Sequence, residues 1–282
     1  MHKGILLPLA LAVVLPLTAQ ESNHLAPAAA THAENIAPQQ TDAVPPRPEG
    51  SIYMGGFRAP KIENVRVAMI GLGERGLPQT IQMTAVPHCE VVAVCDLYDD
   101  LATKTADIVE KAGSKRPAVY SGDKDAYLRM LEEVKPDAVI ISTNWETHAQ
   151  IAIDAMEHGA HAFVEVPLAI TIKDLWRVVD TAERTKKHCM MLENVNYGRD
   201  ELMFLNMVQH GGHGGMDYIM LYRAIECLHK GEPMDQNVYE GALWSAVSPL
   251  SEKSVHEGGA PQIFPDFTRG DWKTTEPLGI VD

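Results

Sequence analysis

The sequence predicts an α/β fold in which a parallel sheet carries helices on both faces. Between residues 65 and 192, short apolar runs alternate with stretches of helical periodicity. Continuously apolar strands of this kind belong to parallel sheets that are buried on both sides and joined by right-handed helical crossovers. Polar residues follow several of the apolar runs, which is where such sheets bind ligands. A ligand site is therefore predicted along one edge of the sheet.

A glycine-rich turn follows the first predicted strand, Val65 to Ile70. Gly71, Gly73 and Gly76 have the spacing of a dinucleotide-binding turn. In such a turn the first glycine permits a tight bend and the second lets the backbone approach a pyrophosphate. The third allows a helix to pack closely on the strand. The fold is therefore predicted to be a Rossmann-type doubly wound parallel sheet.

The remaining elements follow from apolar runs, caps and glycine stops. Strands are predicted at residues 90–95, 138–142, 162–164 and 189–192, and helices at residues 77–85, 101–112, 124–134, 147–158, 200–209 and 216–229. Thr171 and Asp174 resemble a capping box that starts a further helix. Beyond residue 229 the chain is predicted to be irregular. The apolar residues in this region are isolated anchors, namely Trp244, Phe264, Phe267 and Trp272.

The first 19 residues are predicted to be a signal peptide. Lys3 supplies a positive charge, an apolar stretch from Ile5 to Leu17 follows, and Ala19 offers a small residue for cleavage. Export to the periplasm or beyond the cell is therefore expected, and a buried N-terminal helix is the alternative. Residues 20–60 lack apolar periodicity and are predicted to be a flexible linker, with Tyr53 to Phe57 packing locally on the domain that follows.

Charge and composition exclude several classes of partner. The formal net charge of −14 argues against nucleic acid and anionic membranes, which attract clustered cations. The apolar stretch near the N-terminus is shorter than the roughly 20 residues that a membrane span needs. The four cysteines form no C-x-x-C pair, and Cys95 and Cys189 are predicted to be buried in strands.

Histidines in the second half of the chain raise the question of a metal site. His210 and His213 could be joined by Glu226 or His229 as ligands. The glycines between the two histidines leave their spacing undefined, and no H-E-x-x-H motif is present. No metal site is therefore predicted.

Asp96 ends the second predicted strand, 20 residues after Gly76. Its carboxylate is predicted to accept hydrogen bonds from the adenosine ribose, and it would repel a 2′-phosphate, so NAD is favoured over NADP. Glu74 and Arg75 lie within the turn itself. Arg75 is either close to the pyrophosphate or adenine, or simply exposed.

Three further segments follow predicted strands. Asn144, Trp145 and His148 open the helix after the third strand, so Trp145 could stack on the nicotinamide and His148 could donate a hydrogen bond. A purely structural histidine is the alternative. Glu165 and Val166 lie at the end of the next strand.

Asn194 and Tyr197 follow the last predicted strand. Tyr197 is a candidate acid or base, because a nearby charge can tune a phenol. Together these segments place polar and aromatic groups beside the nicotinamide half of a bound cofactor.

The motifs together resemble the glucose–fructose oxidoreductase, inositol dehydrogenase and MocA superfamily, and within it glycoside hydrolase family 109. The matching segments are Tyr53-Met-Gly-Gly-Phe57, Gly71-Leu-Gly-Glu-Arg-Gly76, Asn144-Trp-Glu-Thr-His148, Glu165-Val-Pro167, Glu193-Asn-Val-Asn-Tyr-Gly-Arg199, Gly212-His-Gly-Gly-Met-Asp-Tyr218 and Phe264-Pro-Asp-Phe-Thr-Arg-Gly270. The resemblance implies that the NAD contacts are Glu74, Arg75, Asp96, Asn144, Trp145, His148, Glu165, Val166 and Asn194. It leaves Tyr197, His213 and Tyr218 as the candidates to act near the sugar.

The resemblance implies an exo-acting α-N-acetylgalactosaminidase whose substrate is a glycan. In this family NAD⁺ takes a hydride from C3 of the sugar, a base removes the C2 proton, the glycosidic oxygen leaves, water adds, and the hydride returns. Val166 stands where the sugar dehydrogenases of the superfamily carry a catalytic lysine, and the glycosidase branch shares this change. An NAD-dependent sugar dehydrogenase is therefore the less favoured reading.

One departure from the family pattern lies around residues 210–212. Relatives carry a second sheet domain at this point, so roughly a hundred or more residues are missing, more than loop trimming removes. We therefore expect an NAD-binding domain at residues 61–198 and a remnant of the substrate domain at residues 199–282. A non-catalytic NAD-binding remnant is a further alternative, and a homo-oligomer remains open.

Overall fold

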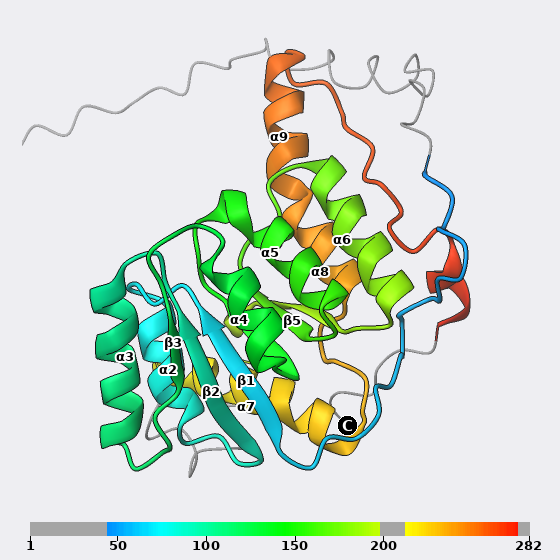
Figure 1. Ribbon diagram of the computed structural model, residues 1–282. Helices are drawn as coiled ribbons and strands as arrows, with labels where there is room; N and C mark the ends of the chain where they lie inside the picture. The colour runs from blue at the N-terminus through cyan, green and yellow to red at the C-terminus, as the bar shows by residue number, and fades with distance from the viewer. Residues whose placement is uncertain (1–43, 198–211, 276–282) are drawn as a thin grey trace, which may run out of the picture. The chain divides into compact units, whose positions relative to one another are not determined.

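Six strands form one parallel sheet in the order β3-β2-β1-β4-β5-β6 (Figure 1). The structure is a computed structural model that describes residues 44–197 and 212–275. The strands are β1 (Val65–Ile70), β2 (Cys89–Cys95), β3 (Ala118–Tyr120), β4 (Ala138–Ile141), β5 (His161–Glu165) and β6 (Cys189–Leu192). The order reverses between β1 and β4, which is the switch point where sheets of this class bind nucleotides. The predicted Rossmann-type sheet is confirmed.

Helices cover both faces of this sheet, because alternate strand residues point to opposite sides. The helices are α2 (Gly76–Met83), α3 (Asp99–Lys111), α4 (Ala126–Val134), α5 (Trp145–Glu157), α6 (Ile172–Thr185), α7 (Met216–Lys230), α8 (Val238–Ser245) and α9 (Val247–His256). Met69 and Phe163 pack on one face with α2, α3 and α7. Ile70 and Val164 pack on the other face with α4, α5, α6 and α8.

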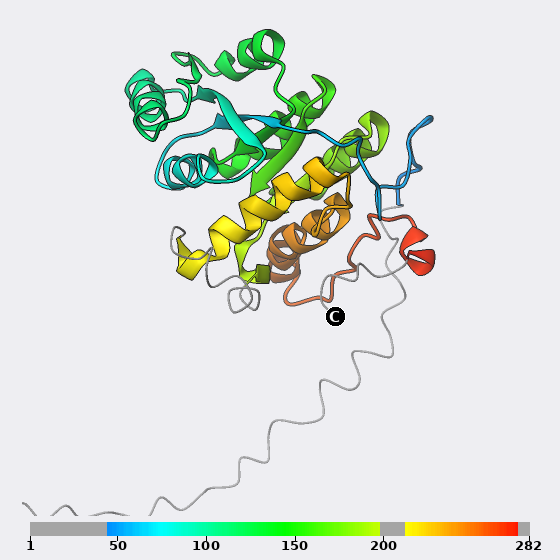
Figure 2. The ribbon, with the colours of Figure 1, turned by 90° about the horizontal axis from the view of Figure 1, so that it is seen from below.

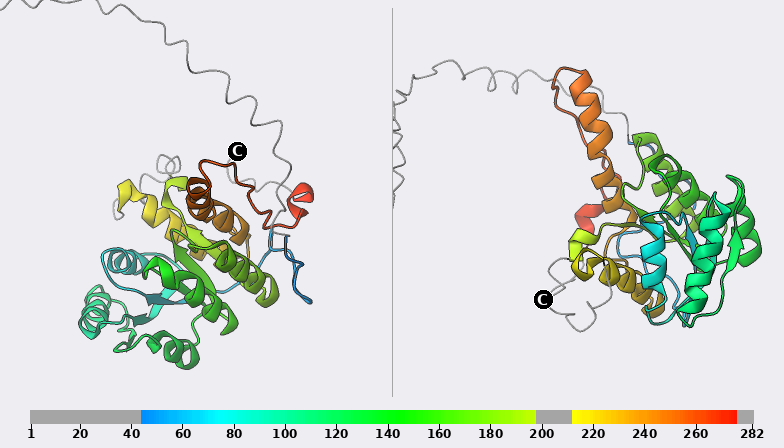
Figure 3. Two further views of the ribbon diagram at one scale, coloured as in Figure 1. Left: turned by 90° about the horizontal axis from the view of Figure 1, so that it is seen from above. Right: turned by 90° about the vertical axis from the view of Figure 1, so that its left-hand side faces the viewer.

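The region after residue 212 shares the core of the sheet. Figure 2 shows α7 lying beside α2 across one face, and these two helices are in contact. On the other face Gly241 of α8 approaches Met191 of β6 so closely that an added Cβ would lie 3.1 Å from the Met191 Cβ. Beyond α8, helix α9 extends past the helices of the sheet (Figure 3). The limits of the domains stay a prediction.

Local signals in the sequence set several element boundaries. The side chain of Thr171 accepts a hydrogen bond from the Asp174 backbone N–H at 3.0 Å, so the predicted start of α6 is confirmed. Gly231 ends α7 with a φ of +67°, a conformation that glycine adopts at little cost. Cys95 and Cys189 are buried as predicted, and their thiols are free.

One strand and two α-helices were absent from the sequence-based prediction, as were the 3-10 helices at Asn194–Tyr197, His213–Gly215 and Asp271–Thr274. Strand β3 has only three residues and pairs with β2 alone, at the edge of the sheet. Helix α8 contains a glycine, and α9 carries Pro249 in its first turn, where proline is tolerated. Both helices are short, so their packing rather than their intrinsic propensity stabilises them.

Part of the predicted linker is fixed to the domain. Ile52 and Met54 contact α6 and α8: the Ile52 backbone N–H donates to the Glu183 carbonyl at 3.1 Å, and the Met54 backbone N–H donates to the Tyr239 hydroxyl at 3.0 Å. Met54 is buried, and the Phe57 ring lies 5.0 Å from the His188 ring, so the predicted local packing of Tyr53 to Phe57 is confirmed. The rest of the linker lies outside the described residues.

Several other predictions also fall outside the described residues. They are the signal peptide at residues 1–19, the helix at residues 200–209, and His210. Within the ranges 44–197 and 212–275, no helix is both long and apolar enough to cross a membrane.

Candidate nucleotide-binding and active site

The glycine turn lies between β1 and α2, at the switch point of the sheet. Gly71 has a φ of +85°, and an added Cβ would lie 2.6 Å from the Ser142 carbonyl oxygen. At Gly76 a Cβ would lie 1.8 Å from the Gly71 carbonyl oxygen, so any side chain there would break the turn. Gly73 is exposed, and among the described residues no atom beyond its chain neighbours lies within 4 Å of a Cβ placed there. The turn therefore leaves open backbone for a pyrophosphate, and a dinucleotide fits this site.

Asp96 lies beside this turn because β1 and β2 pair in parallel up to Ile70 and Cys95. One carboxylate oxygen, Oδ2, accepts a hydrogen bond from the Leu72 backbone N–H at 2.7 Å. The other oxygen, Oδ1, accepts from the Tyr98 backbone N–H at 2.9 Å. Each oxygen keeps a further lone pair, so the carboxylate is oriented and can still accept hydrogen bonds from ribose hydroxyls.

Arg75, the last residue before α2, is the centre of a polar network at the carboxyl edge of the sheet. Its Nε donates to Glu165 Oε1 at 2.7 Å. Its Nη1 and Nη2 donate to Asp217 Oδ2 and Oδ1, at 2.8 and 3.0 Å. This two-pronged contact joins the glycine turn to the first turn of α7. The undescribed residues 198–211 lie between these two segments in the sequence.

The network continues on both sides of Arg75. On one side Gln79, which is fully buried, donates to Glu165 Oε1 at 2.6 Å and accepts from the Ser142 hydroxyl at 2.6 Å. On the other side Asp217 accepts from Asn194 Nδ2 at 2.7 Å and lies 3.0 Å from His213 Nδ1. The ends of β1, β4, β5 and β6 are thereby tied to α7.

Burial and the neighbouring polar groups shift the pKa values of Arg75 and Asp217 in opposite directions. Burial alone would lower the pKa of the Arg75 guanidinium, but the hydrogen bond to Asp217 and the charge of Glu165 outweigh it and raise that pKa. Burial would likewise raise the pKa of Asp217. The hydrogen bonds from Arg75 and His213 outweigh it, so the pKa of Asp217 is lowered. Both groups are therefore charged at neutral pH.

The loop after β4 carries three predicted cofactor contacts. Asn144 caps α5, and Trp145 is 62% exposed at the start of this helix. His148 is 1% exposed, and its ring nitrogens lie 2.8 Å from the Pro167 carbonyl and 3.1 Å from the Thr143 carbonyl. Both ring nitrogens thus face backbone, which favours a role in holding the two loops together. Direct contact between His148 and NAD stays a prediction.

Other predicted contacts reach the same edge from different directions. Glu74 and Gly73 are exposed on the glycine turn, and Val166 is partly exposed beside Glu165. The Val166–Pro167 peptide bond is cis. These positions are consistent with contacts to NAD, which stay a prediction.

The three residues predicted to act near the sugar have different surroundings. Tyr197 is buried, and its hydroxyl donates to Asp235 Oδ2 at 3.2 Å. Burial and the charge of Asp235 raise the pKa of this phenol well above its usual value. Tyr218 is also buried, with its hydroxyl donating to the Ala85 carbonyl at 3.1 Å, and burial raises its pKa. Neither phenol belongs to the Arg75 network.

His213 alone of these three is exposed, and it lies in the network through Asp217. With Nδ1–H donated to the carboxylate, Nε2 carries the free lone pair. Histidine placed in this way can remove a proton from a substrate. Among the described residues, no group of three or more His, Cys, Asp and Glu side chains could hold a metal ion.

Sequence reasoning missed Asp217 and Gln79. Asp217 lies within the Gly212 to Tyr218 segment that carries the resemblance, directly before Tyr218. An acidic residue in the first turn of a predicted helix is usually explained by the helix dipole, so it attracts no functional interpretation. Gln79 lies inside a predicted helix, with no signal for its role.

Two family descriptions match the chain. Residues 65–193 match the oxidoreductase family with an NAD-binding Rossmann fold, and residues 204–274 match the C-terminal domain of glycosyl hydrolase 109. The first match covers the sheet and the glycine turn, so residues 65–193 form an NAD-binding domain. The second match begins inside the undescribed region and includes Asp217.

Curated relatives align along nearly the whole chain. Glycosyl hydrolase family 109 protein 1 of Akkermansia muciniphila is 36% identical over 454 residues, covering 93% of this chain and 94% of the relative. Protein 2 of the same organism is 34% identical, over 84% of this chain and 90% of the relative. The alpha-N-acetylgalactosaminidase of Shewanella oneidensis is 29% identical, over 85% and 93% respectively.

The first alignment is longer than the chain itself. It runs over 454 positions, whereas the chain has 282 residues, so at least 172 positions face a gap in this chain.

Among solved structures, a probable dehydrogenase from Thermotoga maritima is 21% identical with a TM-score of 0.42, covering 51% of this chain and 42% of that chain. A scyllo-inositol dehydrogenase from Lactobacillus casei is 16% identical with a TM-score of 0.41, again over 51% and 42%.

Proposed function

Because this chain belongs to glycosyl hydrolase family 109, we propose that it is an exported exo-acting glycosidase that releases terminal α-N-acetylgalactosamine with the help of NAD. The name of the Shewanella oneidensis relative supports the substrate. The two-pronged contact of Arg75 with Asp217 carries the proposal. It brings the cofactor turn and the family-109 segment to one edge of the sheet, which is the arrangement that a cofactor-dependent glycosidase needs.

The cofactor half of the site consists of the glycine turn and Asp96. Gly73 would give the pyrophosphate access to the backbone, and Asp96 would accept from the ribose hydroxyls. When bound, NAD⁺ supplies a reversible hydride acceptor for C3 of the sugar, and the C3 ketone acidifies the neighbouring C2–H bond.

We assign removal of this C2 proton to His213. Its Nδ1–H donates to Asp217, which fixes the ring and leaves Nε2 as the base. Loss of the C2 proton drives the electron pair into a C1–C2 double bond as the glycosidic C1–O bond breaks. The departing oxygen takes up a proton from solvent. Water then adds at C1, a proton returns to C2, and return of the hydride to C3 with a proton to its oxygen completes hydrolysis without net redox change.

Val166 distinguishes this proposal from a sugar dehydrogenase. A dehydrogenase of the superfamily uses a lysine at this position to remove the hydroxyl proton, and valine has no titratable group. The chain therefore lacks the lysine that a dehydrogenase of that type uses, and in the proposed cycle the C3 hydroxyl proton would pass to water.

The gap in the alignment favours a second candidate, a chain that binds NAD without turnover. At least 172 positions of the Akkermansia muciniphila relative have no counterpart here. The family resemblance implies that the missing segment carries a wall of the sugar site, whereas the residues assigned to NAD are all present. This candidate predicts weak sugar binding and no hydrolysis beside intact NAD binding.

Export is proposed from the N-terminal segment. Lys3, the apolar stretch that follows it and Ala19 form the pattern of a cleaved signal. Fractionation of cells that express the full chain, with N-terminal sequencing of the exported product, tests this. A mature N-terminus near residue 20 supports export, and an intact N-terminus inside the cell contradicts it.

The function is tested by incubating the full chain with NAD⁺ and an aryl α-N-acetylgalactosaminide. The proposal predicts release of the aryl alcohol without accumulation of NADH. Steady growth of NADH with free N-acetylgalactosamine would instead identify a dehydrogenase. Retention of NAD⁺ with neither product would identify the non-catalytic chain and contradict hydrolysis.

A further inference from the structure

A groove of ≈ 460 Å³ lies on the flank of the molecule, between α8 and residues 264–275. It is separate from the nucleotide edge, since none of its lining residues belongs to the Arg75 network. Tyr53 and Tyr239 line its inner end, and Tyr239 donates to Glu183 near the end of α6. Because α6 starts after the carboxyl end of β5 and runs back, Glu183 lies towards the amino ends of the strands. The groove is thus remote from the glycine turn.

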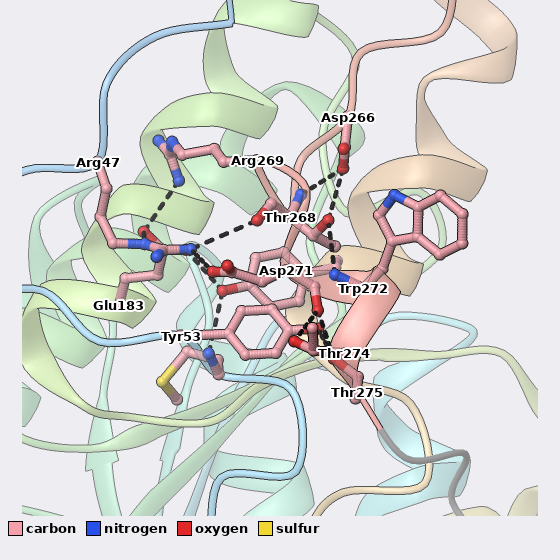
Figure 4. A network of polar contacts seen from close by, with 12 residues as sticks. Arg47, Tyr53, Glu183, Asp266, Thr268, Arg269, Asp271, Trp272, Thr274 and Thr275 are labelled. Atoms are coloured by element: carbon pink, nitrogen blue, oxygen red, sulfur yellow. Dashed lines mark hydrogen bonds and ion pairs between the residues drawn. The ribbon is translucent and has the colours of Figure 1, made fainter.

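The inner wall of the groove is held by a buried charge cluster (Figure 4). Glu183 is fully buried and accepts hydrogen bonds from Arg47 Nε at 3.1 Å, Arg269 Nη1 at 2.9 Å and the Tyr239 hydroxyl at 2.6 Å. Arg269 also pairs with Asp180. The cluster thereby ties residues 44–54 and 266–275 to α6 and fixes the groove before any ligand arrives.

Contacts of Tyr53 set the floor of the groove. Its ring stacks on the Tyr239 ring at 5.1 Å between centroids, with 21° between the ring planes. Its hydroxyl lies 2.7 Å from the Thr275 hydroxyl, close enough for a hydrogen bond. The groove is therefore lined by ordered side chains from three separate parts of the chain.

Apolar side chains on the rim are exposed to a degree that is unusual for their type. Trp272 is 59% exposed, Phe264 45% and Leu243 42%. Figure 4 shows the Trp272 indole directed away from the charge cluster. Phe264 and Trp272 were predicted to be isolated apolar anchors, and both side chains are instead exposed. Aromatic rings exposed beside a groove are characteristic of binding surfaces.

Carboxylates lie beside these rings. Asp266 Oδ1 accepts from the Thr268 backbone N–H at 3.0 Å and from its hydroxyl at 2.6 Å, and Oδ2 has no protein partner in the described part of the chain. Glu240 Oε2 accepts from the Asn237 backbone N–H at 2.7 Å, and Oε1 has no such partner there. The groove therefore offers free acceptor oxygens next to aromatic faces.

We propose that this groove binds a saccharide. A pyranose ring has an apolar face of C–H groups and a rim of hydroxyls, so it matches an aromatic face with carboxylate acceptors at its edge. Leaving these carboxylates without hydrogen-bond partners against a purely apolar ligand would be costly. The volume suits one or two sugar rings.

The test is titration of the full chain with a trisaccharide that ends in N-acetylgalactosamine, followed by saturation-transfer NMR. We expect binding, with a loss of affinity of at least about tenfold in Trp272→Ala. Trp244→Ala is the matched control, because Trp244 lies on α8 and does not line the groove. An unchanged melting temperature shows that each variant folds.

Binding in the groove is separated from binding at the nucleotide edge by His213→Ala. Binding that survives His213→Ala and falls in both Trp272→Ala and Asp266→Asn supports the proposal, whether or not the protein hydrolyses a glycoside. Binding that falls only in His213→Ala would place the sugar elsewhere and overturn it. The absence of trisaccharide binding, or binding of an apolar dye that the trisaccharide does not displace, would also overturn it.

Discussion

The guanidinium of Arg75 and the carboxylate of Asp217 form a two-pronged contact, with N–O distances of 2.8 and 3.0 Å. Arg75 precedes α2 and Asp217 lies in the first turn of α7, so the pair joins helices that are distant in sequence. The Asp217 side chain is only 3% exposed. The contact therefore stabilises the fold as well as the site.

Removal of the guanidinium tests this dual role. Arg75→Ala leaves the buried Asp217 carboxylate without its cation, so we expect the free energy of unfolding to fall by about 3 kcal/mol. Arg184→Ala is the control, because the Arg184–Glu157 pair is exposed and should contribute little. Urea denaturation measures both variants. Equal effects of the two substitutions would show that the Arg75 contact adds nothing beyond a surface pair.

Two glycines of the turn separate cofactor binding from folding. A Cβ at Gly73 would have open space around it within the part of the chain that the structure describes, whereas a Cβ at Gly76 would lie 1.8 Å from the Gly71 carbonyl oxygen. We expect Gly73→Ala to keep the melting temperature and to weaken NAD⁺ binding by about tenfold or more, because the methyl group occupies the place of the pyrophosphate. Gly76→Ala should destabilise the fold itself. Calorimetric titration with NAD⁺ and thermal melting measure the two effects, and unchanged NAD⁺ affinity in Gly73→Ala would refute this placement of the cofactor.

The residues proposed to act on the sugar are ranked by their surroundings. His213→Ala should lower kcat by about a hundredfold, the usual contribution of a general base. Tyr197→Phe should change kcat little, since the Tyr197 hydroxyl is buried against Asp235. Rates with an aryl α-N-acetylgalactosaminide give both values. A large loss in Tyr197→Phe together with normal rates in His213→Ala would reverse the assignment.

Two buried histidines predict how stability depends on pH. Burial lowers the pKa of His188 to about 4, and it lowers the pKa of His161 well below its usual value. As the pH falls, the two histidines are protonated in the unfolded chain before they are protonated in the folded chain. Their contribution to the free energy of unfolding is therefore fully present above pH 6.5 and is lost as the pH drops towards 4. For His188 the loss amounts to about 3 kcal/mol at most.

Urea denaturation between pH 7 and pH 4 checks this dependence. His188→Gln removes one of the two titrating groups, so the variant should lose less stability over that range than the natural chain. Parallel curves for the two proteins would show that His188 does not contribute.

The sheet and the glycine turn could be predicted because their signals are local. Val65 to Ile70 is continuously apolar, and the roles of Gly71, Gly73 and Gly76 depend on spacing alone. The edge strand β3 is too short to give such a pattern. Helix α8 did carry a readable signal, since Asn237 and Glu240 form a capping box, but its glycine weakens the helical pattern.

The polar network could not be predicted because it depends on distant parts of the chain. Arg75 and Asp217 are 142 residues apart, and nothing in either local sequence points to the other. Burial is equally non-local. Phe267 is buried as expected of an anchor, yet Trp272, five residues later, is exposed beside the groove. Both residues have the same apolar character, and only the packing distinguishes them.

The most direct test of the central claim is hydrolysis of the aryl α-N-acetylgalactosaminide in D₂O with NAD⁺ bound. The proposed mechanism removes the C2 proton and replaces it from solvent, so the released N-acetylgalactosamine should carry deuterium at C2. His213→Ala should suppress both release and exchange. Release of a sugar that keeps its original hydrogen at C2 would contradict the mechanism, and the absence of both release and exchange with NAD⁺ bound would contradict catalysis by this chain.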